Sequence, residues 1–195
     1  LWRSWGVEPE VVVGHSVGEV AAGYVCGALS LDDAARVVCA RSRLAAERCS
    51  GKGGMLVVGL PRVAAEVRLE GHSGLCVAVH NAPGFVVVSG ALAELNTLIA
   101  ELAVDEVWCK RVQGDFASHS SQMDPVSVEL EEVLVGLQPR AGSVAFFSVV
   151  TTKFVAGDTL SGRYWSMNLR EPVRFAEAIQ RLATDGYSCF VELSP

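Results

Sequence analysis

A short apolar strand that runs straight into a sharp turn constrains this chain more than any other feature. Val11-Val12-Val13 leads into Gly14-His15-Ser16-Val17-Gly18, and a helical pattern follows. In a strand, Gly-x-Ser-x-Gly, helix arrangement the serine sits on a strained turn that raises its hydroxyl above a sheet edge. The pattern predicts that Ser16 is a nucleophile and that the Val17 amide binds an oxyanion. Both glycines are expected to prevent Cβ clashes in the turn.

Composition limits the kind of protein that can carry this turn, because short patterns of this type also occur in ordinary turns. The chain has 195 residues, of which 50% are hydrophobic and 19% charged, so we expect a folded protein with one core and room for a small added unit. No apolar stretch approaches a membrane span and no signal segment opens the chain, so we expect a soluble, cytoplasmic protein without a membrane partner. The net charge of -6 argues against nucleic acid, although local arginines can still bind a small anion.

The six cysteines are scattered along the chain, without the close pairs of a metal or redox site. Most lie in apolar runs, so we expect buried free thiols, no disulfide framework and no metal site. They are Cys26, Cys39, Cys49, Cys76, Cys109 and Cys189.

The order of elements predicts an α/β fold with two units, because Val-rich runs alternate with helical patterns. Residues 53–112 read as strand, helix, strand, strand, helix, strand, the order of a ferredoxin-like unit. Residues 1–52 and 113–195 would form the larger unit. Its expected helices span about 17–26, 125–134 and 175–184, with another from Leu31 through Leu44 to a break at 51–54, and its expected strands are 144–149 and 189–193. Since the chain starts at Leu1 and stops just past a predicted strand, we expect an excerpt of a longer polypeptide, truncated at both ends.

A serine nucleophile needs a base, and the chain has four histidines. His119 is the best candidate because it lies in a loop among small residues. His15 is adjacent to Ser16 in the strained turn, where neighbouring side chains point apart, so it would rather orient the turn. We expect the others, His72 in a surface turn and His80 at a strand end, to be structural or solvated. A carboxylate or a backbone carbonyl would orient the base, and spacing does not choose between them.

Arg41 lies in the middle of a helix that is otherwise strongly apolar. An isolated arginine in such a place is usually a snorkelling or salt-bridged residue. From the residues alone this remains the favoured interpretation.

A series of short motifs in a fixed order covers almost the whole chain. They are Gly14-His15-Ser16-Val17-Gly18-Glu19, Gly27-Ala28-Leu29-Ser30-Leu31, Arg41-Ser42-Arg43, Gly53-Gly54-Met55, Val86-Val87-Val88-Ser89-Gly90, Ala117-Ser118-His119-Ser120, Tyr164-Trp165, Asn168-Leu169-Arg170-Glu171-Pro172-Val173-Arg174-Phe175 and Glu192-Leu193-Ser194-Pro195. With them the chain resembles the acyltransferase domain of modular type I polyketide synthases, which is related to malonyl-CoA:acyl carrier protein transacylases.

The resemblance implies an α/β-hydrolase-like large subdomain with an inserted ferredoxin-like small subdomain. It implies that Ser16 is acylated, that His119 is its base, and that the main-chain carbonyl of Asn168 holds the imidazole. Arg41 would pair with the free carboxylate of a malonyl-type group, which a guanidinium fork matches. The other residues expected to contact substrate are His15, Val17, Phe116 and Ser118.

The implied reaction has two steps, in which Ser16 takes an acyl group from a coenzyme A thioester and a carrier-protein phosphopantetheine thiol removes it. No bound cofactor is expected. The expected partners are an acyl carrier protein domain and flanking ketosynthase and other synthase domains. The family's glutamine-bearing oxyanion segment would lie before Leu1, so we expect the excerpt alone to be inactive.

The sequence leaves the acyl group and the acceptor open. Phe116-Ala117-Ser118-His119 is similar to the form associated with methylmalonyl extenders, whereas Val17 is more like malonyl-selective relatives. One methyl group is worth only about 1–3 kcal/mol, so we lean to methylmalonyl without excluding malonyl. The alternatives are a serine hydrolase or esterase, which would pass the acyl group to water, and a degenerate, non-catalytic carrier-docking module.

Overall fold

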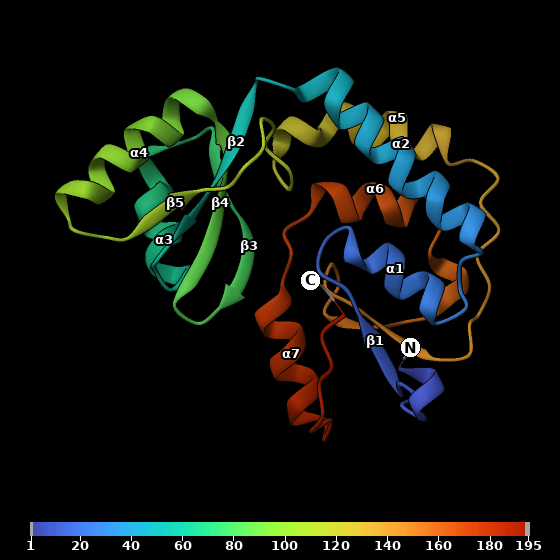
Figure 1. Cartoon of the computed structure of the whole chain (residues 1–195). Helices are drawn as coiled ribbons and strands as arrows, with labels where there is room; N and C mark the ends of the chain where they lie inside the picture. Colours follow the sequence, from blue (N-terminus) through green and yellow to red (C-terminus); the bar gives the residue numbers. More distant parts are fainter. Residues whose placement is uncertain (1, 194–195) are drawn as a thin grey trace.

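The computed structural model describes residues 2–193, which form two β-sheets with helices packed on them (Figure 1). The first sheet has three strands in the order β1-β6-β7: β1 (Val11–Val13), β6 (Ala145–Ser148) and β7 (Lys153–Val155). β1 pairs in parallel with β6, and β7 pairs antiparallel with β6. A parallel pair joined through helices confirms the predicted α/β class.

The second sheet has four antiparallel strands in the order β3-β4-β2-β5. These are β2 (Gly53–Val58), β3 (Leu75–Ala82), β4 (Phe85–Ala91) and β5 (Cys109–Arg111). Helix α3 (Arg62–Arg68), continued by a short 3-10 turn (Leu69–Gly71), and helix α4 (Leu92–Val104) connect them. The order strand, helix, strand, strand, helix, strand is that of the predicted ferredoxin-like unit.

The remaining helices surround the three-stranded sheet. They are α1 (Gly18–Val25), α2 (Leu31–Cys49), α5 (Asp124–Val133), α6 (Gly162–Arg170) and α7 (Phe175–Thr184), with short 3-10 turns at Arg3–Trp5, Ser121–Met123 and Gly157–Thr159. The start of α2 follows from its sequence, because the Ser30 hydroxyl accepts a hydrogen bond from the Asp33 amide at 3.0 Å. Asp32 and Asp33 also favour the positive end of the helix.

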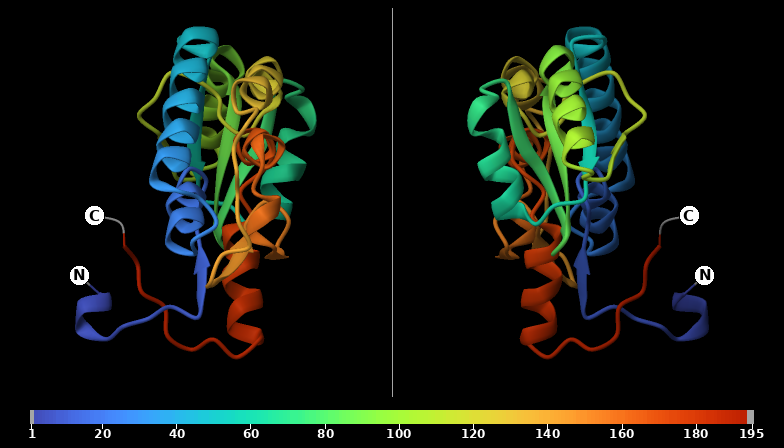
Figure 2. Two further views of the ribbon diagram at one scale, coloured as in Figure 1. Left: turned by 90° about the vertical axis from the view of Figure 1, so that its right-hand side faces the viewer. Right: turned by 90° about the vertical axis from the view of Figure 1, so that its left-hand side faces the viewer.

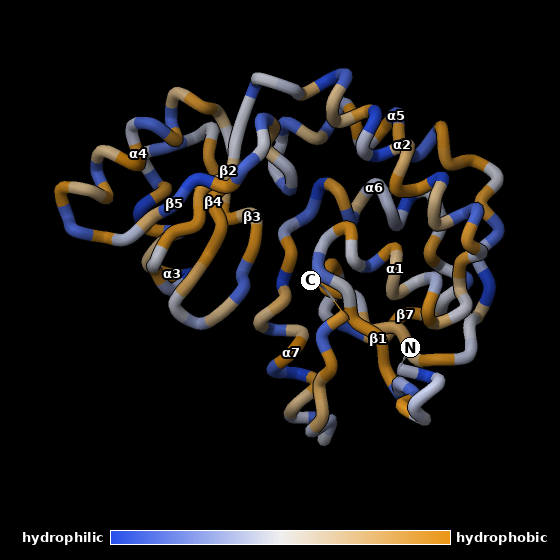
Figure 3. The backbone as a smooth tube through the Cα atoms, viewed as in Figure 1, coloured by the Kyte–Doolittle hydropathy of each residue, from blue (hydrophilic) through white to orange (hydrophobic). Residues whose placement is uncertain are grey.

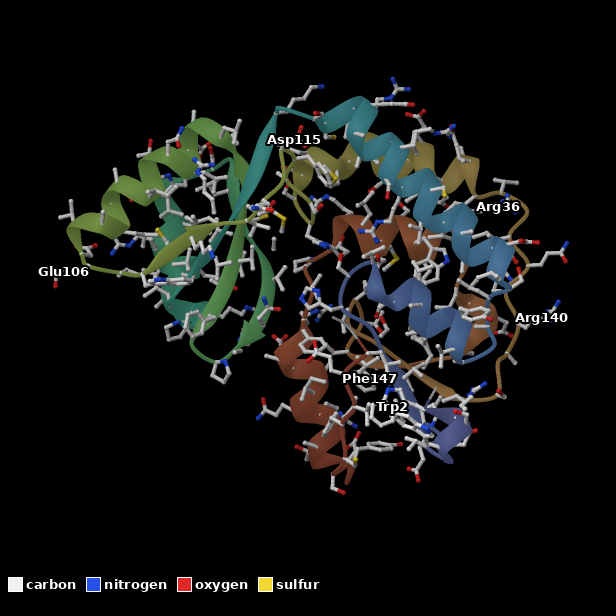
Figure 4. All side chains as sticks on the ribbon, in the orientation of Figure 1. Trp2, Arg36, Glu106, Asp115, Arg140 and Phe147 are labelled. Carbon is white, nitrogen blue, oxygen red and sulfur yellow. The ribbon has the colours of Figure 1, made fainter. Side chains whose placement is uncertain are left out.

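The central strands of the two sheets, β6 in the first and β2 and β4 in the second, are largely buried. The hydropathy view shows the apolar composition of β1 and β4 in orange (Figure 3). In β6, Phe146 packs into the core under α1, α2, α5 and α6, and Phe147, labelled in Figure 4, packs on the opposite side. In β4, Val86 and Val88 face α3 and α4, whereas Val87 joins Phe147. Side chains of a strand alternate between faces, so the two sheets meet in one shared apolar cluster that includes Ala178 and Leu182 of α7.

The chain enters and leaves the four-stranded sheet at neighbouring points. The Ser50 hydroxyl donates to the Asp115 carboxylate, and the Gly51 amide donates to the Asp115 carbonyl oxygen at 2.8 Å. Figure 4 labels Asp115 at this place, between β2 and the helices of the larger unit. The contact ties the outgoing and returning segments together, while the predicted unit boundaries at 52/53 and 112/113 stay a prediction.

Two predictions about local structure were wrong. Residues 189–193 do not form a strand, and Figure 2 shows this segment as an extended trace beyond α7. A strand needs a neighbour to satisfy its backbone groups; within the described residues this segment has none, and Phe190, Val191 and Leu193 are exposed. Conversely, β7 lies outside the strands predicted for the larger unit, and it forms because its three residues pair with the edge of β6.

All six cysteines are free thiols, as predicted, but only Cys26 and Cys49 are buried. Cys39 and Cys189 are exposed, so the expectation of general burial was wrong: an apolar run does not fix which side of a helix or segment a residue takes. Among the described residues no helix is long and apolar enough to cross a membrane.

Candidate active site

The turn between β1 and α1 has the strained geometry that the sequence predicts. Ser16 adopts a left-handed backbone conformation with φ 53°. A Cβ atom on Gly14 would lie 2.2 Å from the Glu19 amide nitrogen, so this position requires glycine. The same prediction for Gly18 was wrong, because a Cβ there would meet nothing within 4 Å. Within residues 2–193 the Val17 N–H has no hydrogen-bond partner, and it lies at the start of α1 where an anion is stabilised.

Ser16 and His119 lie together although 103 positions separate them. The Ser16 Oγ atom is 2.8 Å from His119 Nε2. His119 is buried, with φ 59°, and its amide donates to the Leu169 carbonyl oxygen at 3.2 Å. The loop that carries His119 is therefore fixed against the end of α6 before any substrate is present.

The main-chain carbonyl that contacts the imidazole is that of Glu171, not that of Asn168 as expected. The distance from His119 Nδ1 to the Glu171 oxygen is 2.9 Å. Asn168 lies inside α6, whereas Glu171 is the first residue after it, with an extended backbone whose carbonyl is free to turn toward the histidine. Because a carbonyl only accepts, Nδ1 carries the proton and Nε2 is left to accept the serine proton.

Burial lowers the pKa of His119 to about 4. The hydrogen bond to the Glu171 carbonyl opposes this shift, and the positive charge of Arg41 and His15 adds to it. The imidazole is therefore neutral at neutral pH, which is the protonation state a general base needs.

Arg41 reaches the same hydroxyl from α2. Its Nη2 atom is 3.4 Å from Ser16 Oγ, and its Nη1 atom donates to Asn168 Oδ1 at 2.7 Å. Burial lowers the pKa of Arg41 to about 10, an effect that the negative charge of Glu19 opposes. The guanidinium stays charged at neutral pH, so the site holds a fixed cation beside Ser16.

Two groups at the site were missed in the sequence. The Asn168 side chain, rather than its carbonyl, links the turn to Arg41, since its Nδ2 atom donates to the Ser16 carbonyl oxygen at 3.1 Å and to Glu19 Oε2 at 2.8 Å. Glu19 is fully buried, and this burial raises its pKa to about 7 against the hydrogen bonds it accepts. A carboxylate on the apolar face of α1, three positions after the serine, was the available signal.

The four other residues expected to contact substrate differ in their exposure and in the contacts they make. His15 is exposed, its Nε2 atom is 2.8 Å from Asn81 Oδ1 of β3, and its ring packs edge-on against Phe175. Val17 is exposed at the start of α1. Phe116 is half-buried against the helical core. The Ser118 carbonyl oxygen accepts a hydrogen bond from Ser89 at 2.7 Å.

The other two histidines lie in the four-stranded unit. His72 is buried rather than exposed, with Nε2 3.1 Å from Glu101, and His80 lies 3.4 Å from Glu177. Neither contacts Ser16. No group of three or more potential metal ligands occurs among the described residues.

The fold and the site define an α/β protein in which a serine on a strand-to-helix turn meets a neutral histidine and a buried arginine. The chain belongs to the acyl transferase domain family, whose family model matches residues 1–195.

Its relatives are components of modular polyketide synthases. The chain is 51% identical over 196 residues to the spectinabilin polyketide synthase system protein NorA' of Streptomyces orinoci. It is 46% identical over 196 residues to erythronolide synthase EryA2 of Saccharopolyspora erythraea. Both alignments cover 100% of this chain but only 5% and 6% of the relatives' own length.

Solved structures agree with the fold. The acyltransferase domain from module 8 of the salinomycin polyketide synthase matches with a TM-score of 0.91 and 40% identity, over 95% of this chain and 44% of that one. The malonyl CoA-acyl carrier protein transacylase of Clostridium perfringens matches with a TM-score of 0.86 at 23% identity over 95% of this chain and 60% of that one, a likeness of fold alone.

Proposed function

We propose that this chain transfers a malonyl-type acyl group from coenzyme A to the phosphopantetheine thiol of an acyl carrier protein, through an ester on Ser16. The observation that carries the proposal is the 2.8 Å contact between Ser16 Oγ and His119 Nε2, with the Arg41 guanidinium 3.4 Å from the same oxygen. The relatives' membership of modular polyketide synthases supports a carrier protein as acceptor, with a ketosynthase as neighbouring domain.

The first step forms the ester. His119 Nε2 takes the hydroxyl proton while Ser16 Oγ attacks the thioester carbonyl, and the Val17 amide stabilises the negative charge that develops on the carbonyl oxygen. The carbon–sulfur bond then breaks, and the imidazolium returns the proton to the departing coenzyme A thiolate. The Glu171 carbonyl keeps Nδ1 as the donor throughout, so only Nε2 exchanges a proton.

The second step reverses the roles. His119 takes the proton of the pantetheine thiol, the thiolate attacks the ester carbonyl, and the Ser16 oxygen leaves with the proton held on Nε2. The enzyme returns to its starting protonation state, and no cofactor takes part.

Arg41 supplies the selection for a free carboxylate. A guanidinium pairs with a carboxylate through parallel hydrogen bonds. Because Arg41 Nη1 donates to Asn168, the substrate carboxylate would be bound by the remaining N–H groups of the guanidinium. An acetyl group would leave the buried cation unpaired, and loss of one partner of such a pair costs about 2–5 kcal/mol. Carboxylated acyl groups are therefore favoured over acetyl.

Within the malonyl class we favour methylmalonyl. Ser118 is small and leaves room for a methyl group beside His119, whereas Val17 is more typical of malonyl-selective relatives. Since a methyl group is worth about 1–3 kcal/mol, the preference would be a ratio of rates rather than exclusion. The proposed location is the cytoplasm.

Intact-mass analysis of the complete polypeptide that contains this chain tests the proposal. We expect an adduct on Ser16 after exposure to methylmalonyl-CoA or malonyl-CoA, its transfer to a carrier protein bearing phosphopantetheine, and no adduct in Ser16→Ala. Acetyl-CoA is expected to give a much slower adduct. Absence of any adduct on Ser16 would favour a docking module, and release to water in preference to the carrier thiol would favour a hydrolase.

A further inference from the structure

Glu19 is a buried carboxylate that the proposed reaction does not use. It lies in the first turn of α1 with no exposed surface. Its oxygens accept hydrogen bonds from the Val149 amide at 2.6 Å, the Tyr164 hydroxyl at 2.7 Å and the Asn168 Nδ2 atom at 2.8 Å. Burial of a carboxylate costs free energy unless hydrogen bonds compensate for the lost water. The groups that make these hydrogen bonds indicate the role of Glu19.

On one side of Glu19, the hydroxyl groups of Ser148 and Tyr164 form a chain of hydrogen bonds that ends at its carboxylate. Ser148 Oγ accepts from the Val150 amide at 3.2 Å and the Thr151 amide at 3.1 Å. A serine oxygen has two lone pairs, so Ser148 must donate its proton to the Tyr164 oxygen, which lies 2.8 Å away. Tyr164 then donates to Glu19, and Glu19 is the acceptor at which this chain of hydrogen bonds ends.

On the other side, Glu19 fixes the direction of the Asn168 amide. Asn168 Nδ2 faces two acceptors, Glu19 Oε2 and the Ser16 carbonyl oxygen, and Oδ1 faces the Arg41 donor at 2.7 Å. A turned amide would place its NH2 group against the guanidinium and its oxygen against the carboxylate. The arrangement therefore leaves Asn168 with one orientation, the one that holds Arg41 next to Ser16.

We propose that Glu19 is a positioning residue for acyl-group selection, which acts by orienting Asn168 so that Asn168 holds the Arg41 guanidinium at the carboxylate-binding position. The inference rests on the proposed function, in which Arg41 binds the carboxylate of the acyl group. It assigns Glu19 no contact with substrate.

Glutamine at position 19 separates this role from simple space filling. A carboxyl group keeps a lone pair on Oε2 in both of its protonation states, so Asn168 Nδ2 always has an acceptor. Glutamine has one acceptor oxygen, and the main-chain amide of Val149, which cannot turn, holds that oxygen at the Oε1 position. The NH2 group then occupies the Oε2 position, where two donors face each other across 2.8 Å. Asn168 must then turn, and Arg41 loses its partner while the volume of the side chain is unchanged.

The test compares Glu19→Gln with the unchanged protein in the complete polypeptide. The readout is the ratio of kcat/KM for malonyl-CoA or methylmalonyl-CoA to kcat/KM for acetyl-CoA, which does not depend on how much of the protein is folded. We expect this ratio to fall about 10- to 100-fold, the factor for losing a hydrogen bond to a charged group. Asn168→Ala, which removes the link itself, is expected to lower the ratio by a similar factor.

Two further variants make the outcome specific. Glu129→Gln makes the same chemical change on the surface of α5, where Glu129 pairs with Arg48, and is expected to leave the ratio unchanged. Arg41→Ala is expected to abolish the preference for carboxylated donors. If Arg41→Ala and Asn168→Ala lower the ratio and Glu19→Gln does not, or if only Arg41→Ala lowers it, the role of Glu19 is overturned while the proposed function stands. If Arg41→Ala leaves the ratio intact, the proposed function loses its selection element.

Discussion

The Nδ1 atom of His119 lies 2.9 Å from the main-chain oxygen of Glu171, so a peptide carbonyl occupies the place beside the imidazole where many serine enzymes have a carboxylate. A carbonyl sets the tautomer of the ring without adding a negative charge. The side chain of Glu171 takes no part in this contact.

Replacement of Glu171 by alanine should leave acyl transfer within about threefold of the unchanged rate, because the substitution keeps the main-chain carbonyl and removes only an exposed side chain. His119→Ala should abolish Ser16 acylation, because the base is lost. Both variants are compared by the initial rate of adduct formation on Ser16. A loss in Glu171→Ala as large as that in His119→Ala would mean that the carboxylate, rather than the carbonyl, assists the base.

The lowered pKa of His119 predicts how Ser16 reactivity depends on pH. The neutral imidazole is the active form, and its pKa lies at about 4 because of burial. Sulfonyl fluoride labelling of Ser16, which does not depend on Arg41 recognising a carboxylate, should stay near its maximum down to about pH 5 and fall by half near pH 4. A midpoint near 6.5, the value of an unperturbed histidine, would contradict this prediction.

The two glycines of the turn should differ in their tolerance of alanine. Gly14→Ala forces a Cβ atom to within 2.2 Å of the Glu19 backbone, and overpacking of this kind costs about 1–3 kcal/mol or more. Gly18→Ala meets nothing within 4 Å in the first turn of a helix, where alanine is favoured by up to about 1 kcal/mol. Urea unfolding of both variants measures the difference, and equal loss of stability would refute the assignment.

Burial of Glu19 predicts a pH-dependent free energy of unfolding. Its folded-state pKa of about 7 exceeds the reference value of 4.5, so the folded protein binds the proton more tightly than the unfolded chain. This contribution to stability is complete below pH 4.5 and is lost as the pH rises through 7. His119 shifts stability in the opposite sense, because its pKa is lowered.

Comparison with Glu19→Gln isolates the contribution of Glu19, since His119 is common to both proteins. The difference in unfolding free energy should change by about 3 kcal/mol between pH 4.5 and 7, in favour of Glu19→Gln at the higher pH. Parallel curves for the two proteins would show that Glu19 titrates alike in the folded and unfolded states.

Local signals in the sequence predict most elements of this fold. Ser30 with Asp32 and Asp33 marks the start of α2, and the continuous apolar run Leu56-Val57-Val58 marks a strand buried on both faces. Such features depend only on near neighbours in the chain. The strand predicted at residues 189–193 was wrong because the segment has the composition of a strand, whereas the neighbouring strand that it would need cannot be read from the segment itself.

The sequence predicted three side chains of the site, Ser16, His119 and Arg41, and missed the groups that hold them in place. Ser16 could be recognised from its own turn and His119 as the best candidate base from its loop, whereas a role for Arg41 was expected only from the family resemblance. That the Glu171 carbonyl meets the imidazole depends on where α6 ends, because Glu171 is the first residue after the helix. Glu19 was visible in the first motif, but its function depends on Asn168, which is 149 positions away.

The chain enters the four-stranded unit after Ser50 and Gly51 and returns from it at Asp115, and these two segments are hydrogen-bonded to each other. A graft of that unit from a related synthase would have one junction to rebuild, since both ends of the insert meet there. What the graft must also match is the surface of Met55, Val57, Val79 and Val87, which rests against Phe147 and α7. Compatibility of that apolar surface, more than the length of the joints, would decide whether a hybrid folds.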